Sequence, residues 1–187
     1  MSEEADAEAV AEAFTEALAE AELDAEPSVS GRISLAHAVK AASTPAPVAP
    51  QFFTKPNTTV VGPGDPVTLP DYSEAVSPEG ELAVVIGRIA KSVPLERVPE
   101  VVFGYTVAND LTARDVMDTD AQWTRAKSFD GSTPLGPWIE TQLDTDSLNI
   151  TTWVDGDTLQ EGNTSEMHYS VAELVAAASE VFTLLPG

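Results

Sequence analysis

The chain has 187 residues, no cysteine, and 31 acidic against nine basic residues, for a net charge of −22. This length allows one domain with a substantial core, and the lack of cysteine excludes disulfides and thiolate chemistry. So acidic a surface repels nucleic acid and anionic membranes, so we expect neither as a partner. The sequence shows no apolar run of about 20 residues and no signal-peptide pattern, and we expect a cytoplasmic protein.

The first part of the chain carries a dense share of the acids. Ten of them fall in the first 26 positions without a single Lys or Arg, and the other 21 are spread over the remainder. Residues 1–30 therefore form an Ala- and Glu-rich arm, which we expect to be helical or partly disordered. Acidity spread over the whole body is typical of a protein that works in concentrated salt, where charge repulsion is screened.

A proline-rich stretch separates this arm from the rest of the chain. "ASTPAPVAP", residues 42–50, has three prolines and predicts an extended connector. From residue 51 to residue 187, short apolar runs recur between turn signals, as expected for strands. The sequence therefore predicts a β-rich α+β domain with a few short helices.

Local signals within residues 51–187 predict individual elements. The Asp-Gly pair of "VDGD" predicts a tight hairpin turn, and "LERVPE" predicts a short helical turn. Residues 170–182 have helical spacing, with Ser170 as the N-cap and Glu173 three positions later, the pattern of a capping box.

Two glutamates stand immediately before a strand-like apolar run in "SPEGELAVVIGR". Glu79 and Glu81 are two positions apart, so in a strand their carboxylates project from the same face. Like charges that close repel each other, and a compensating group is expected. The alternative at this stage is that a solvated strand end simply carries two exposed glutamates.

A third acid, Asp110, follows the strand-like run "VVFGYTVAN". If the two strands are neighbours, three carboxylates meet at one place. Carboxylate oxygens are the ligands that hard divalent cations such as Mg²⁺ choose, and a cation between the two glutamates would keep both ionised.

Three of the nine basic residues gather within fourteen positions of the chain: Arg114, Arg125 and Lys127. In so acidic a protein this clustering indicates an anionic ligand such as a carboxylate. The alternative is that these cations pair with acids of the same stretch, namely Asp115, Asp118, Asp120 and Asp130.

Together, three segments of the sequence resemble the fumarylacetoacetate hydrolase family. They are "EGELAVVIGR", "GYTVANDLTARDV" and "RAKSFDGSTPLGPWI", with "FFTKPNTTVVGPGDPV" before them and "LQEGNTSEMHYS" after. The resemblance runs from about Gly31 to the C-terminus and is strongest to the small single-domain branch. That branch holds acylpyruvate hydrolases, oxaloacetate decarboxylases and 2-hydroxyhepta-2,4-diene-1,7-dioate isomerases. It implies a mixed β-sheet roll or sandwich and a homodimer.

The resemblance assigns roles to particular residues. It implies Glu79, Glu81 and Asp110 as ligands of Mg²⁺ or Mn²⁺. Catalytic and substrate-binding roles fall to a second set: Lys127 as the active-site lysine, Arg114 as the arginine of the T-A-R-D motif, Lys55 as a lysine near the site, and His37 as the water-activating base on a lid within residues 31–50.

The chain also departs from the family pattern. Ile33 and Ser34 replace the usual Asn-Tyr of the lid, and Lys40 replaces the glutamate that would orient His37. Met117 stands where the family often has a substrate-contacting glutamine. The sequence ends at "EVFTLLPG", ahead of the strands and loop that follow in the family, so we expect a domain shortened at its C-terminal end.

The resemblance implies a reaction on a 2-oxo acid. We expect C–C bond hydrolysis of an acylpyruvate through a metal-stabilised enolate, with a small-molecule 2-oxo acid as the only partner besides a second subunit. The alternatives are isomerisation or oxaloacetate decarboxylation on the same scaffold, or a non-catalytic member that binds metal.

Overall fold

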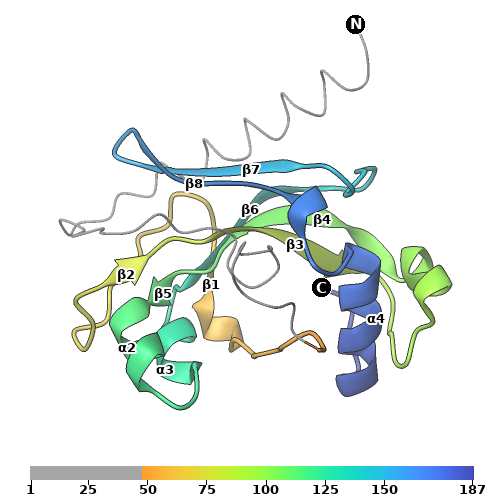
Figure 1. Cartoon of the computed structure of the whole chain (residues 1–187), viewed down its shortest axis with the longest axis horizontal. Helices are drawn as coiled ribbons and strands as arrows, with labels where there is room; N and C mark the ends of the chain where they lie inside the picture. Colours follow the sequence, from red (N-terminus) through yellow and green to blue (C-terminus); the bar gives the residue numbers. More distant parts are fainter. Residues whose placement is uncertain (1–47) are drawn as a thin grey trace, which may run out of the picture.

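The computed structural model of the chain describes residues 48–187 (Figure 1). The acidic arm of residues 1–30 lies outside the described residues, as does the lid segment with His37, Ile33, Ser34 and Lys40.

The described part is rich in short strands. They are β1 (Val60–Val61), β2 (Val76–Ser77), β3 (Gly80–Ile86), β4 (Val102–Asn109), β5 (Thr112–Ala113), β6 (Thr133–Glu140), β7 (Asn149–Val154) and β8 (Asp157–Asn163). The α-helices are α2 (Arg114–Thr119), α3 (Thr124–Lys127) and α4 (Val171–Val181), and the 3₁₀ turns are Asn57–Thr59, Leu95–Glu100 and Thr164–Glu166. This composition confirms the β-rich α+β class expected from the sequence.

A four-stranded sheet with the order β1-β6-β4-β3 forms the frame of the molecule. Strands β3 and β4 are antiparallel, β4 and β6 are antiparallel, and β1 runs parallel to β6. Two smaller pairs accompany the frame: β2 with β5, and the hairpin of β7 with β8. The sheet is therefore mixed, as the family resemblance implies.

The β7–β8 hairpin turns at the Asp-Gly pair that the sequence indicates. Asp155 and Gly156 both have positive φ, 53° and 84°, which is the backbone a two-residue turn of this kind requires. Figure 1 shows the hairpin lying along one side of β3 and β4, while α2 and α3 gather at one end of the sheet and α4 stands at the other.

The main hydrophobic core lies between the sheet and α4. Buried Val98, Val171 and Val175 pack with side chains from alternate positions of β3, among them Leu82 and Val84. Ser170 caps α4 with both hydrogen bonds of a capping box, its hydroxyl accepting from the Glu173 N–H and its own N–H donating to the Glu173 carboxylate. The predicted helix start is confirmed.

Within residues 48–187, no helix is both long enough and apolar enough to cross a lipid bilayer.

Strands β4 and β6 approach each other so closely at Gly104 that a larger residue there should destabilise the protein. A Cβ on Gly104 would lie 2.5 Å from the Glu140 carbonyl oxygen and 2.7 Å from the Ile139 Cγ2, so Gly104→Ala must push two paired strands apart. We expect the substitution to lower the free energy of unfolding by about 1–3 kcal/mol in urea denaturation. Gly62→Ala is the matched control, because its Cβ would meet only the Asp65 carboxylate, at 3.2 Å. Equal stability of the two variants would contradict the prediction.

Candidate metal centre

The register of β3 against β4 brings the three predicted acids together on one face. Gly80 lies opposite Asn109 and Glu81 lies opposite Ala108, so Glu79 stands opposite Asp110, whose N–H donates to the Glu79 carbonyl at 2.9 Å. Residues directly opposite each other point to the same side of a sheet, and so do residues two apart. The carboxylates of Glu79, Glu81 and Asp110 therefore share one face, while Gly80 faces the other way.

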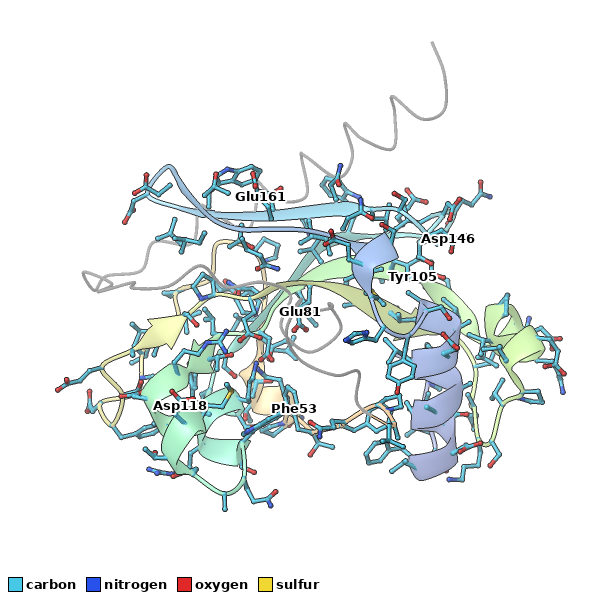
Figure 2. All side chains as sticks on the ribbon, in the orientation of Figure 1. Phe53, Glu81, Tyr105, Asp118, Asp146 and Glu161 are labelled. Carbon is cyan, nitrogen blue, oxygen red and sulfur yellow. The ribbon has the colours of Figure 1, made fainter. Side chains whose placement is uncertain are left out.

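These carboxylates are close to one another and largely withdrawn from solvent. One oxygen from each residue lies within 4.8 Å of the other two. Glu79 and Asp110 are only 4% and 3% exposed, so the alternative of a solvated strand-end glutamate does not hold for Glu79. Figure 2 shows Glu81 on the side of the sheet away from the β7–β8 hairpin.

Lys127 lies at the centre of this group. Its side chain is 1% exposed, and its Nζ donates to Glu79 Oε2 at 2.8 Å and to Asp110 Oδ2 at 2.6 Å. The ammonium group also lies 5.4 Å from the centroid of the Phe53 ring, a cation–π distance. A buried lysine needs such partners, because burial without them disfavours its charge.

Arg114 and Lys55 complete the ring of cations. Arg114 forms an ion pair with Glu79 Oε1, and its Nε donates to Ser77 Oγ at 2.9 Å. Lys55 forms an ion pair with Asp110 Oδ1, and its Nζ donates to the Ser132 carbonyl at 3.1 Å. Burial lowers the pKa of Lys55, and the neighbouring Lys127 adds to this, although Asp110 opposes the shift.

The three clustered basic residues separate into two kinds. Arg125 pairs with Asp120 of its own stretch at 2.6 Å and stacks over the Tyr72 ring, with more than half of its side chain exposed. For Arg125 the alternative of local pairing is correct. Arg114 and Lys127 instead pair with Glu79, far away in the sequence, so the alternative of local pairing does not hold for them.

Glu81 differs from the other two acids because, among the described residues, its carboxylate makes no ion pair. Its pKa is raised to about 7, first by burial and then by the charges of Asp110 and Glu79, against the opposing influence of Lys127 and Lys55. The sequence predicts repulsion between the carboxylates, and in the structure this repulsion is felt most by Glu81, which forms no ion pair with a described cation.

The three acids fit a hard divalent cation. They offer only oxygen ligands from one face, and within residues 48–187 no cation pairs with the Glu81 carboxylate. Glu79 Oε2 and the two Asp110 oxygens each have one partner among the described residues, and because a carboxylate oxygen has two lone pairs, each of these can serve a cation as well. Glu79, Glu81 and Asp110 are therefore the residues that would hold Mg²⁺ or Mn²⁺.

Several supporting residues were not singled out from the sequence. Thr112 Oγ1 donates to Glu79 Oε1 at 3.0 Å, and Ser132 Oγ donates to the Lys127 carbonyl at 2.9 Å. Both residues are fully buried and lie within the family-like segments, but nothing in their local pattern distinguishes them from core filler. Met117, at the position of the expected glutamine, packs against the buried cluster of Ala113, Val116 and Ala126.

The three carboxylates at the ends of β3 and β4, with the buried Lys127 and the partly buried Lys55 and Arg114 around them, define this chain as a candidate metal-dependent protein. The chain belongs to the fumarylacetoacetate hydrolase family: the family's C-terminal domain, fumarylacetoacetate (FAA) hydrolase C-terminal, matches residues 25–187. The family resemblance of the sequence is confirmed.

Proteins similar to this chain include named enzymes. A mitochondrial oxaloacetate tautomerase of Xenopus laevis is 40% identical over 150 residues, which are 78% of this chain and 47% of that protein. The structure of a 5-carboxymethyl-2-hydroxymuconate delta-isomerase from Mycobacterium smegmatis matches with a TM-score of 0.76 and 45% identity, covering 80% of this chain and 59% of that one. A 2-hydroxyhepta-2,4-diene-1,7-dioate isomerase from Mycobacterium marinum matches with a TM-score of 0.73 and 46% identity, over 75% and 56%. The chain thus spans about half the length of these relatives.

The raised pKa of Glu81 predicts a dependence of stability on pH in metal-free protein. Folded Glu81 keeps its proton up to about pH 7, whereas the unfolded residue loses it near 4.5. Between pH 4.5 and about pH 7 the folded state therefore binds one more proton than the unfolded state. The free energy of unfolding then falls as pH rises through this range. We expect Glu81→Gln to remove this fall and to raise the melting temperature at pH 8 by an amount on the order of 5 °C.

The effect of a divalent cation on the melting temperature tests whether Glu81 is a metal ligand. Mn²⁺ should raise the melting temperature of the parent protein, and more at pH 8 than at pH 5.5, because protons compete for the ligand. Glu81→Gln should lose most of that gain. Glu161→Gln, which removes an exposed glutamate of the hairpin, is the control and should behave like the parent. An unchanged response to Mn²⁺ in Glu81→Gln would show that Glu81 is not a ligand.

Proposed function

We propose that the protein is a divalent-metal-dependent enzyme that acts on a 2-oxo acid through its enolate. The observation that carries this proposal is the cluster itself, in which Lys127 contacts both Glu79 and Asp110 while Glu81 makes no ion pair with any described residue. Six ionisable side chains brought together below the surface are costly to the fold, and such groupings are typical of functional sites.

The charge balance of the cluster indicates the kind of substrate. Three carboxylates face three cations, Lys55, Arg114 and Lys127, so the protein groups alone roughly cancel. A bound divalent cation would leave an excess of two positive charges in a largely buried site. The enolate of a 2-oxo acid carries two negative charges and would restore the balance. Its carboxylate and keto oxygens also suit an oxygen-seeking cation.

The protein's own residues have distinct tasks in this proposal. Arg114 and Lys55 have side chains that are 24% and 15% exposed, and their task in this proposal is to bind and orient the substrate carboxylate. Lys127 is fixed by two carboxylates and offers its ammonium to the oxygen on which negative charge develops. A bound cation would add Lewis-acid polarisation of the keto group.

Hydrolysis of a C–C bond in an acylpyruvate is the first candidate reaction of that enolate. It needs a base that activates water, and His37 is the residue we propose for this task from the family pattern. Tautomerisation or isomerisation is the second candidate, because it needs only proton transfer beside the same stabilised charge. Relatives at 40–46% identity with the names tautomerase and isomerase support it. Decarboxylation of oxaloacetate would use the same enolate.

The test is turnover of acetylpyruvate and of oxaloacetate in concentrated KCl with Mg²⁺, repeated with EDTA. We expect EDTA to abolish turnover, and the products decide among reactions: acetate with pyruvate, CO₂ with pyruvate, or a tautomer alone. His37→Ala should abolish hydrolysis and spare tautomerisation. Folded protein that binds Mg²⁺ without turning over either compound would instead indicate a non-catalytic member.

Two arginines of the same stretch provide a matched pair for the site. Arg114→Gln should lower kcat/KM by about 10²–10³-fold, because a buried charge-assisted contact beside the substrate is lost. Arg125→Gln should leave kcat/KM within about twofold, because that guanidinium is exposed and pairs with Asp120. Equal effects of the two substitutions would remove Arg114 from the site.

A further inference from the structure

The two glutamates of the candidate metal centre are joined by a glycine, Gly80. Glycine has no Cβ and rotates about its backbone bonds more freely than any other residue. The relative direction of the Glu79 and Glu81 carboxylates therefore depends on whatever fixes the two peptide groups of Gly80.

On the β4 side, nothing holds these two groups. In an antiparallel pair, backbone groups point alternately toward and away from the partner strand. The Asp110 N–H donates to the Glu79 carbonyl, so the N–H and C=O of the next residue, Gly80, point away from β4. β3 is also the last strand of the four-stranded sheet, and no further strand of the described chain pairs with its outer side.

The side chain of Gln160 takes the place of the missing strand. Its Oε1 accepts the Gly80 N–H at 2.8 Å, and its Nε2 donates to the Gly80 carbonyl at 2.8 Å. Gln160 is 2% exposed. One amide therefore holds both peptide groups of the flexible residue, in a dry environment where such hydrogen bonds are strong.

The β7–β8 hairpin positions and orients the Gln160 amide. Thr152 lies directly opposite Gln160, and its Oγ1 donates to Gln160 Oε1 at 3.0 Å, which fixes the orientation of the amide. The register shifts just beyond this pair, and such bulges redirect side chains. The approach is so close that a Cβ on Gly80 would lie 2.5 Å from Thr152 Oγ1. A side chain at position 80 would therefore displace Thr152 or the strand.

We propose that Gln160 is a positioning residue that sets the affinity of the metal centre by fixing Gly80 from the face opposite the carboxylates. This inference rests on the proposed metal site and adds the residue that holds its geometry. The hydrogen bonds of the Gln160 side chain go to Gly80 and Thr152 and not to the three ligand side chains, so we expect its effect on the metal to pass through the backbone of Gly80.

The experiment measures Mn²⁺ binding to the full chain by calorimetry and by electron paramagnetic resonance, with no substrate present. Gln160→Leu keeps the size of the side chain and removes both hydrogen bonds, and we expect it to weaken Mn²⁺ binding about 10–100-fold. It should also speed hydrogen exchange at the Gly80 amide in metal-free protein. Thr152→Val keeps Gln160 but removes the hydroxyl that orients it, and should weaken binding less, in the same direction.

Thr164→Val, at the residue that directly follows β8, is the matched control. Thr164 is buried, and its Oγ1 accepts the Leu148 N–H at 2.8 Å at the end of the hairpin away from the turn. Its loss should cost similar stability and leave Mn²⁺ affinity within about twofold. Parent-like affinity in Gln160→Leu, or an equal loss in Thr164→Val, would overturn the positioning role while the metal site stands. Absence of Mn²⁺ binding by the parent protein would overturn the metal site itself.

Discussion

The constraint on which the rest of this structure depends is that three carboxylates face one another below the surface. Glu79, Glu81 and Asp110 are brought together by the ordinary register of β3 and β4, and bringing them together is unfavourable unless positive charge is supplied. That positive charge comes from Arg114 and Lys127, in the two helices that follow β5, and from Lys55, in the segment that precedes β1. Segments distant in sequence are thus held in place partly by one electrostatic requirement.

The two faces of the β3–β4 pair differ in function: one packs against the rest of the protein, and the other carries the candidate site. One face presents Leu82 and Val84 to the core under α4 and presents Gly80 to the hairpin, so it supplies apolar burial and backbone fixation. The other face carries the carboxylates and their cations. Because side chains of a strand alternate strictly, the core side can be packed tightly without occupying the site, and the site inherits its rigidity from that packing.

Family membership indicates which reactions the fold can host, whereas the local geometry indicates what kind of substrate the site suits. The relatives show that this scaffold hosts tautomerases and isomerases as well as hydrolases, so the fold alone does not select a reaction. In the function that we propose, the charge balance of the site favours an anionic substrate that suits an oxygen-liganded cation. What separates hydrolysis from proton transfer is the base that activates water, and the residue proposed for it, His37, lies outside the described part of the chain.

Local chemistry allowed much of this structure to be predicted from the sequence. The two-residue spacing of Glu79 and Glu81 placed them on one face, the Asp-Gly pair gave the hairpin turn, and Ser170 with Glu173 gave the start of α4, because each signal acts within a few residues. Tertiary structure alone decided that Arg125 pairs locally while Arg114 reaches Glu79, and that Gln160 holds a glycine 80 positions away. Those contacts depend on strand register and on how the hairpin packs against β3, and no local spacing along the chain encodes either.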